Sequence, residues 1–120
     1  MLPFTLGQIA ITIKDLPRAV AFYRDTLGLK LLFEVSGMAF FDIGGVRLML
    51  TAAEKPEATH SSILYYKTPD LHATASDLEA KGVTLQAKPH PVAKMPDHEL
   101  WMAFLRDTEG NLLGLMSEVR

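Results

Sequence analysis

Apolar and polar residues alternate near the start of the chain and then change to a helical spacing. In "QIAITI", residues 8–13, every second position is isoleucine, which is typical of a strand with one buried face. Asp15 next provides a helix N-cap, Pro17 fits the first turn and Gly28 supplies a stop, so the pattern predicts a helix between them. Three short apolar segments bounded by turn residues then predict three strands: "LKLLFEV", "MAFFDI" and "VRLMLT".

The second half of the chain repeats this order of elements. The segment "ILYYKTPDLHATASDLEAKGVTLQ" again predicts a strand, a cap at Asp70, a helix, a glycine stop and a strand. The tripeptide "MAF" occurs at 38–40 and again at 102–104. We infer an internal duplication rather than chance similarity within an unrelated α+β sandwich. The predicted fold is α+β, a single domain of two βαβββ modules at about 1–54 and 60–120 joined by the polar stretch "AAEKPEATHSS".

Composition narrows the class of protein. The chain has 120 residues, of which 48% are hydrophobic and 22% charged, with a net charge of −2, as in a soluble globular protein. It has no basic run for nucleic acid and no apolar run long enough to cross a bilayer, so neither partner is expected. Cysteine is absent, which excludes disulfides and thiolate chemistry. The first residues, "MLPFTLGQ", lack the pattern of a secretory signal, and we expect a cytoplasmic protein.

Two segments, "QIAITIKDLPRAVAFYRDTLGL" and "FLRDTEGNLLGLM", resemble the vicinal oxygen chelate superfamily, which contains glyoxalase I, extradiol dioxygenases and bleomycin-resistance proteins. The resemblance covers nearly the whole chain. It implies paired modules that form a cupped mixed sheet with the helices outside, usually in a homodimer. It also implies a divalent ion held in the cup of metal-bearing members by one side chain from each of four strands. The matching positions in this chain are Gln8, Met49, Ile63 (or its neighbour Ser62) and Gly114.

These four residues are a poor set of metal ligands. Gln8 offers an amide oxygen and Met49 a soft thioether, whereas Ile63 and Gly114 offer no donor. Relatives carry a carboxylate at the last position, so Gly114 replaces a ligand. We therefore predict no metal cofactor at the family's positions. Gly114 either leaves space for an organic ligand or allows close packing within the sheet, and both interpretations stay open.

Strand alternation places further polar side chains beside these positions. Arg47 shares a face with Met49, and Tyr65 and Lys67 share a face with Ile63. A mostly apolar pocket with cationic edges favours a small anionic organic ligand, although both cations are equally consistent with solvated strand ends. The predicted ligand-binding residues are Gln8, Arg47, Met49, Tyr65, Lys67, Trp101 and Gly114.

The segment 88–107, "KPHPVAKMPDHELWMAFLRD", corresponds in the superfamily to the loop that often closes over the ligand, so the resemblance implies a polar loop at the mouth of the cup. It carries His98 and Glu99, which are candidates for a general acid or base, and Trp101, a candidate aromatic wall. A solvated histidine and a core tryptophan explain the same residues. His60, His98 and Glu99 would together make a replacement metal site, but their spacing does not favour one.

The sequence is compatible with three functions. The first is a small-molecule-binding protein or non-metal enzyme that takes a small anionic organic ligand. The second is a divalent-metal-dependent lyase, isomerase or dioxygenase, in which the ion polarises a carbonyl or enediolate. The third is a dimeric scaffold with an unused cup. Fold resemblance alone does not choose among them, nor does it name a substrate.

Overall fold

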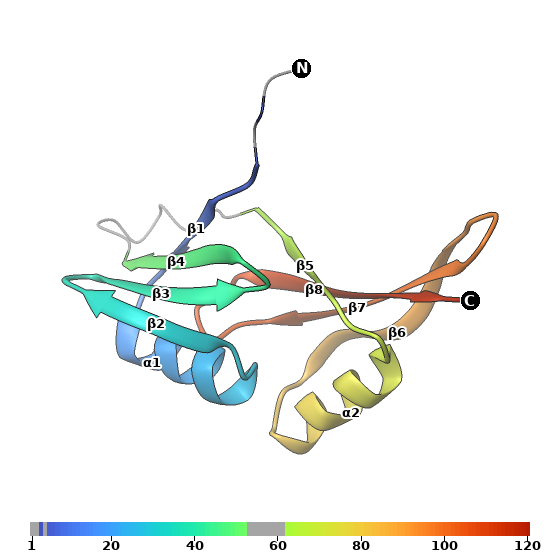
Figure 1. The fold of residues 1–120 in the computed structure, drawn as a ribbon. Coiled ribbons are helices and arrows are strands. Elements are labelled where there is room, and N and C mark those ends of the chain that lie inside the picture. Colours follow the sequence, from blue (N-terminus) through green and yellow to red (C-terminus); the bar gives the residue numbers. More distant parts are fainter. Residues whose placement is uncertain (1–2, 4, 53–61) are drawn as a thin grey trace. The chain divides into compact units, whose positions relative to one another are not determined.

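Each half of the chain folds into a four-stranded sheet with a helix against one face, as the computed structural model shows (Figure 1). The structure describes residues 3, 5–52 and 62–120. The chain divides into two compact units, which we call the first module (Met1–Ser62) and the second module (Ile63–Arg120). The predicted α+β class and the two βαβββ modules are confirmed.

The two modules have the same topology. In each sheet the first strand lies parallel to the last, and the two middle strands join them by antiparallel pairing, in the orders β1-β4-β3-β2 and β5-β8-β7-β6. This shared order is what an internal duplication predicts. The first module contains β1 (Gln8–Ile13), α1 (Leu16–Ala21), β2 (Lys30–Val35), β3 (Met38–Ile43) and β4 (Val46–Ala52). The second contains β5 (Leu64–Lys67), α2 (Leu71–Ala80), β6 (Leu85–Lys94), β7 (Glu99–Arg106) and β8 (Leu112–Val119).

Both helices begin where the sequence predicts. Asp15 caps α1 by accepting a hydrogen bond from the backbone N–H of Arg18 at 3.1 Å, and Asp70 caps α2 in the same way from Ala73 at 3.1 Å. The predicted first helix is present, but its second half, Phe22–Thr26, is π-helical. Gly28 follows with a φ of 75°, a conformation that favours glycine.

The helix lies on the face of the sheet that the isoleucine pattern marks as buried. Tyr23 follows α1, is fully buried and meets the ring of Phe41 at 6.0 Å between centroids. The apolar side chains of the second module pack against α2 in the same way, and burying each large one contributes about 1.5–3 kcal/mol. The buried apolar residues of the two strand sets include Ile11, Ile13, Phe41, Leu48 and Leu50 in the first module and Ala103, Leu105, Leu113 and Leu115 in the second.

The loop that the resemblance implies in the segment 88–107 is mostly strand in the structure. Residues Leu85–Lys94 form β6, which pairs antiparallel with β7 and leaves only a tight turn at 95–98. Pro89 and Pro91 are tolerated within β6 because it is the edge strand of its sheet, where a missing N–H costs little. The register also shifts three times along this pair, as bulges do when they re-aim a strand.

Most of the predicted linker, with His60, lies outside the described residues. Among the helices that the structure describes, none is long and apolar enough to cross a membrane.

The turn between β7 and β8 is held by a buried carboxylate. Asp107 accepts hydrogen bonds from the backbone N–H groups of Glu109 and Asn111, both at 2.8 Å, and from the Asn111 side-chain amide at 3.0 Å. Gly110 completes the turn with a φ of 88°. Because the turn fixes the register of the two strands, it also places Gly114 directly opposite Phe104.

We predict that Asp107→Ala lowers the free energy of unfolding by about 2 kcal/mol or more, because it leaves buried N–H groups without an acceptor. Urea unfolding followed by circular dichroism measures the change. Asp42→Ala is the matched control, since Asp42 accepts a single, exposed backbone hydrogen bond, from Gly45 at 3.2 Å, in the corresponding turn of the first module. Equal losses in the two variants would contradict the role given to Asp107.

Candidate functional site

In each module one face of the sheet carries no helix of that module, and we call it the helix-free face. Most of the predicted site residues lie on these two faces. In the first module, Gln8 and Arg47 are direct neighbours on β1 and β4, and the Gln8 side-chain amide donates a weak hydrogen bond to the Met49 sulfur at 3.8 Å. The structure therefore brings Gln8, Arg47 and Met49 together on one face of this module, as the sequence predicts.

Arg47 lies over an aromatic pair that the sequence reasoning did not single out. The rings of Phe33 and Phe40 are stacked with centroids 4.5 Å apart, and the Arg47 guanidinium carbon lies 5.9 Å and 5.8 Å from the two centroids. At these distances the cation is attracted to the ring faces. Asp42 is the cross-strand neighbour of Arg47, yet its carboxylate accepts from the Gly45 backbone instead. Among the described residues Arg47 makes no ion pair.

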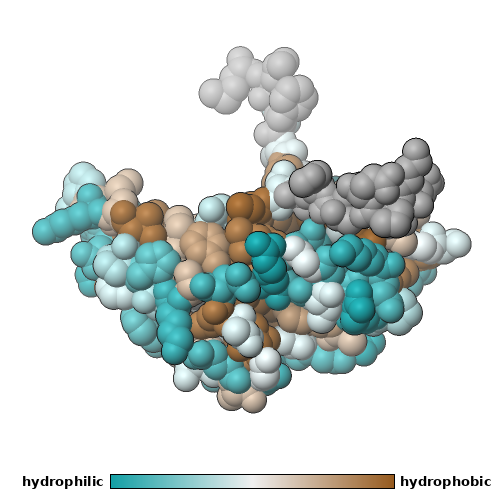
Figure 2. All heavy atoms as spheres, turned by 180° about the vertical axis from the view of Figure 1, so that it is seen from behind, coloured by the Kyte–Doolittle hydropathy of each residue, from teal (hydrophilic) through white to brown (hydrophobic). Residues whose placement is uncertain are grey.

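Large apolar side chains remain exposed in both modules. Figure 2 shows one face of the molecule, where hydrophobic residues (brown) reach the surface between hydrophilic ones (teal). Phe33 is 44% exposed and Tyr65 45% exposed, and both belong to helix-free faces. Exposed aromatic rings beside isolated polar groups are typical of small-molecule sites.

In the second module the structure brings Tyr65, Lys67 and Gly114 to one face. Tyr65 is the cross-strand neighbour of Gly114, and Lys67 is that of Met116. A Cβ atom placed on Gly114 would lie 2.6 Å from Cε2 of Tyr65, so the Tyr65 ring occupies the space that a side chain at 114 would take. Of the two interpretations of Gly114, this contact favours close packing. The predicted third position, Ile63, precedes β5 and is 43% exposed.

Tyr66 points to the opposite side from Tyr65. Its hydroxyl is buried and has no hydrogen-bond partner among the described residues. Burial, with a smaller effect from the charge of Asp107, raises the pKa of Tyr66 well above its usual value. Burial therefore favours the neutral phenol.

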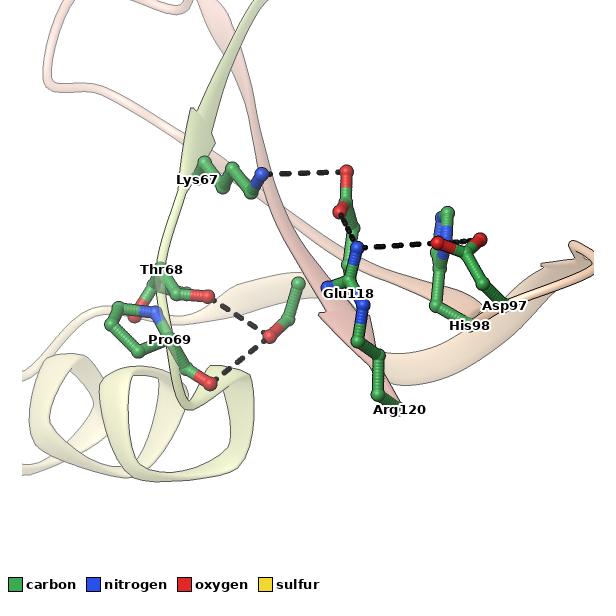
Figure 3. Close-up of polar contacts among 8 residues, drawn as sticks. Lys67, Thr68, Pro69, Asp97, His98, Glu118 and Arg120 are labelled. Atoms are coloured by element: carbon green, nitrogen blue, oxygen red, sulfur yellow. Dashed lines mark hydrogen bonds and ion pairs between the residues drawn. The ribbon is translucent and has the colours of Figure 1, made fainter.

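A depression of about 440 Å³ lies at the end of β5 and β8, beside a network of charges (Figure 3). Glu118 is ion-paired with Lys67 at 3.4 Å and with Arg120 at 3.4 Å, and Arg120 also pairs with Asp97 at 3.5 Å. Lys67, the first cause, and then His98 and Arg120 lower the pKa of Glu118. An anion that bound Lys67 would have to displace Glu118, so Lys67 is a weaker anchor than Arg47. The depression is lined by Lys67, Thr68, Pro69, Ser117, Glu118 and Arg120.

His98 lies at this network and has a carboxylate partner. Its Nδ1 atom lies 2.7 Å from Oδ1 of Asp97, and its side chain is 14% exposed. The hydrogen bond to His98 lowers the pKa of Asp97. With Nδ1 donating to Asp97, the free lone pair of the ring is on Nε2, which is the arrangement of a histidine base oriented by a carboxylate. Sequence reasoning named His98 but did not find Asp97 as its partner.

Glu99 and Trp101 lie elsewhere. The Trp101 indole N–H donates to the Glu99 carboxylate at 2.7 Å, and the indole ring meets His72 of α2 with centroids 5.3 Å apart. Both side chains are thus on the helix side of the second sheet. The structure does not bring them to the face that carries Tyr65 and Gly114.

The residues at the family's metal positions do not fit a divalent ion. The Gln8 amide donates to the thioether sulfur of Met49. The Tyr65 ring occupies the space that a side chain at position 114 would need. Carboxylate, imidazole and water are the ligands such ions prefer. Among the described residues, no three His, Asp or Glu side chains gather as a metal site would need.

The structure adds residues to the candidate site, and the repeat contains the signal that would have found two of them. Phe40 and Phe104 are the last residues of the two "MAF" tripeptides. They occupy equivalent places, because Phe40 pairs with Met49 and Phe104 pairs with Gly114. The ion-pair network of Glu118, Arg120 and Asp97 has no comparable signal, since it depends on how the β6–β7 turn approaches the last strand.

The fold, the repeated module and the chain's motifs together define the class of protein. The model of the glyoxalase/bleomycin resistance protein/dioxygenase superfamily matches residues 5–115. The chain belongs to this superfamily, as the resemblance in the sequence predicted.

Individual relatives are distant. The chain is 31% identical over 126 residues to the uncharacterized protein YraH of Bacillus subtilis, covering 90% of this chain and 94% of that protein. It is 28% identical over 108 residues to the metallothiol transferase FosB of Staphylococcus epidermidis, which covers 90% of this chain but only 63% of FosB.

Solved structures with the same fold include two with broad coverage. A glyoxalase/bleomycin resistance protein/dioxygenase from Alicyclobacillus acidocaldarius has a TM-score of 0.79 at 20% identity, over 99% of this chain and 95% of that one. A lactoylglutathione lyase from Agrobacterium tumefaciens has a TM-score of 0.76 at 22% identity, over 98% and 96%. At these identities the likeness concerns the fold alone.

We predict that Lys67→Met raises the pKa of Glu118 toward the ordinary carboxylate value, because the Lys67 ion pair is the first cause of its lowering. In the wild type, the stability from this pair is present above the ordinary pKa and is lost as the pH falls through the lowered one. Carbon NMR of the Glu118 carboxyl against pH measures the shift. Lys30→Met, an exposed lysine of the first module, is the control, and identical Glu118 titrations in both variants would contradict the assignment.

Proposed function

We propose that this protein binds a small anionic organic molecule on the helix-free sheet face of its first module without a metal ion. Arg47 is the anchor for the anion, Gln8 supplies a polar contact, and the exposed part of the Phe33–Phe40 pair takes the apolar body. The observation that carries the proposal is the position of Arg47: a guanidinium over two phenyl rings with no carboxylate partner among the described residues.

Physical chemistry supports an anion at this position. A guanidinium offers several N–H donors in a planar fork that matches a carboxylate or phosphate. Where a protein does not need such a cation for its own ion pairs, binding a ligand anion costs no internal partner. Lys67 differs in this respect, because Glu118 competes for it. Superfamily membership is compatible with this function but does not specify it.

Catalysis without metal is a separate part of the proposal and concerns the second module alone. Asp97 and His98 have the geometry of an oriented base, at 2.7 Å. Glu99 instead accepts a hydrogen bond from the Trp101 indole on the helix side of the sheet. A ligand bound at the second module and carrying an acidic proton would give His98 a proton to remove, independently of the anion held at Arg47.

A metal-dependent transferase is the second candidate, because the relative FosB is named a metallothiol transferase. The donor set at the family's positions argues against a metal ion, since Met49 offers only a thioether and Gln8 only an amide as a metal ligand. The chain also spans only 63% of FosB.

The predicted homodimer stays a prediction, which light scattering checks.

We predict that Arg47→Ala weakens the binding of phenylacetate about tenfold or more, as expected for the loss of a charge-assisted hydrogen bond. Isothermal titration calorimetry in low salt gives the dissociation constants. Phenylacetamide, which has the same ring without the charge, should bind both proteins equally. Arg18→Ala is the control for net charge, because Arg18 is exposed on α1, on the other side of the first sheet. If Arg47→Ala has no effect on phenylacetate, or affects phenylacetamide as strongly, Arg47 is not the anion anchor.

We predict further that removal of divalent metal leaves phenylacetate binding unchanged. Protein treated with a chelator and dialysed should show the same dissociation constant as untreated protein. Zinc, nickel, manganese and iron(II) should not raise the melting temperature in the concentration-dependent way of a ligand that binds only the native state. Stoichiometric metal together with such a shift would favour the second candidate.

A further inference from the structure

Aromatic side chains from three strands form a line across the helix-free face of the second module. Tyr65 of β5 and Phe104 of β7 are the two cross-strand neighbours of Gly114 on β8. The rings of Tyr65 and Phe104 meet edge to face, with centroids 5.9 Å apart and planes at 79°. The ring of His90, on β6, lies 6.5 Å from that of Phe104. We call these three rings with Gly114 the aromatic row.

Gly114 is needed for its lack of a side chain rather than for its backbone. Its φ is not among the positive values that other glycines of the chain adopt, so a different residue would meet no backbone strain. A Cβ atom at 114 would instead collide with the Tyr65 ring, at 2.6 Å from Cε2. The glycine therefore fixes where the ring of Tyr65 lies, over the strand and against the edge of Phe104.

The row presents an accessible, nearly uncharged aromatic surface. Tyr65 is 45% exposed although its ring is held by two neighbours. The Nδ1 atom of His90 lies 2.6 Å from the Lys88 carbonyl oxygen, which leaves Nε2 for another partner. The nearest cation on the same strand as Tyr65, Lys67, is neutralised by Glu118. A surface of this kind suits a planar aromatic ring better than a flexible aliphatic chain or a charged group.

We propose that the aromatic row is a stacking site for a planar, uncharged aromatic ring of a small molecule, and that Gly114 is a positioning residue that sets Tyr65 for it. This site uses residues of the second module alone. It is therefore independent of the anion anchor at Arg47, and either proposal can fail without the other.

The test compares 2-naphthol with its saturated counterpart, decahydro-2-naphthol, which has the same polar group and skeleton without the aromatic rings. Proton–nitrogen NMR of the whole chain gives both dissociation constants and shows which backbone amides respond. We expect 2-naphthol to bind about fivefold more tightly than the saturated alcohol, with shifts centred on residues 65, 104 and 114. Equal affinities, or shifts elsewhere, overturn the proposal whatever phenylacetate does.

Variants separate positioning from simple packing. Tyr65→Ala should lower the affinity for 2-naphthol about fivefold, whereas Tyr65→Phe should keep it. Gly114→Ala should lower it as much as Tyr65→Ala, and the double variant should lose no more than either single one, because both act through the same ring. Lys30→Ala serves as the unaffected control. Unchanged binding in Gly114→Ala overturns the positioning role, and unchanged binding in Tyr65→Ala overturns the site. If Gly114→Ala does not fold, the comparison of Tyr65→Ala with Tyr65→Phe alone decides whether the site exists.

Discussion

A four-stranded sheet packed on one helix buries only one of its faces, and most of this protein's properties depend on that constraint. Because side chains alternate along a strand, each strand places half of its residues against the helix and half away from it. Ile11 and Ile13 are accordingly almost fully buried, while Gln8, on the other face of the same strand, is exposed. The chemistry that remains available in each module is whatever the helix-free face carries.

The same alternation explains which parts of the site the sequence predicts. Once the strands are recognised, the alternation of side chains predicts which face Arg47, Met49 and Lys67 occupy. The structure places all three on the predicted faces. The faces of Trp101 and Glu99 were not predicted, because both residues lie in the segment 88–107, where the resemblance implied a loop, and no face can be assigned to a loop. In the structure, Met102 lies on the helix-free face of β7, so its neighbour Trp101 lies on the helix side.

Partners in space are harder to predict than faces. The ion pairs of Glu118 join the ends of β5 and β8, and the pair of Arg120 with Asp97 reaches the β6–β7 turn. No local pattern encodes that meeting of segments. The bulges along β6 add to the difficulty, because each one shifts the register by an amount that the alternation of residues does not reveal. The Arg47 contact with Phe33 and Phe40 likewise needs the pairing of three strands.

The duplication gives the most direct view of how the two faces diverged. Equivalent places hold Ala10, Met49 and Phe40 in the first module and Tyr65, Gly114 and Phe104 in the second. The phenylalanine is common to both, whereas the other two positions have exchanged a small and a large residue between neighbouring strands. Such an exchange keeps the filled volume similar, as close packing requires. It also replaces the thioether of one face with a phenol ring on the other, so two sheets of the same topology differ in the chemistry of their helix-free faces.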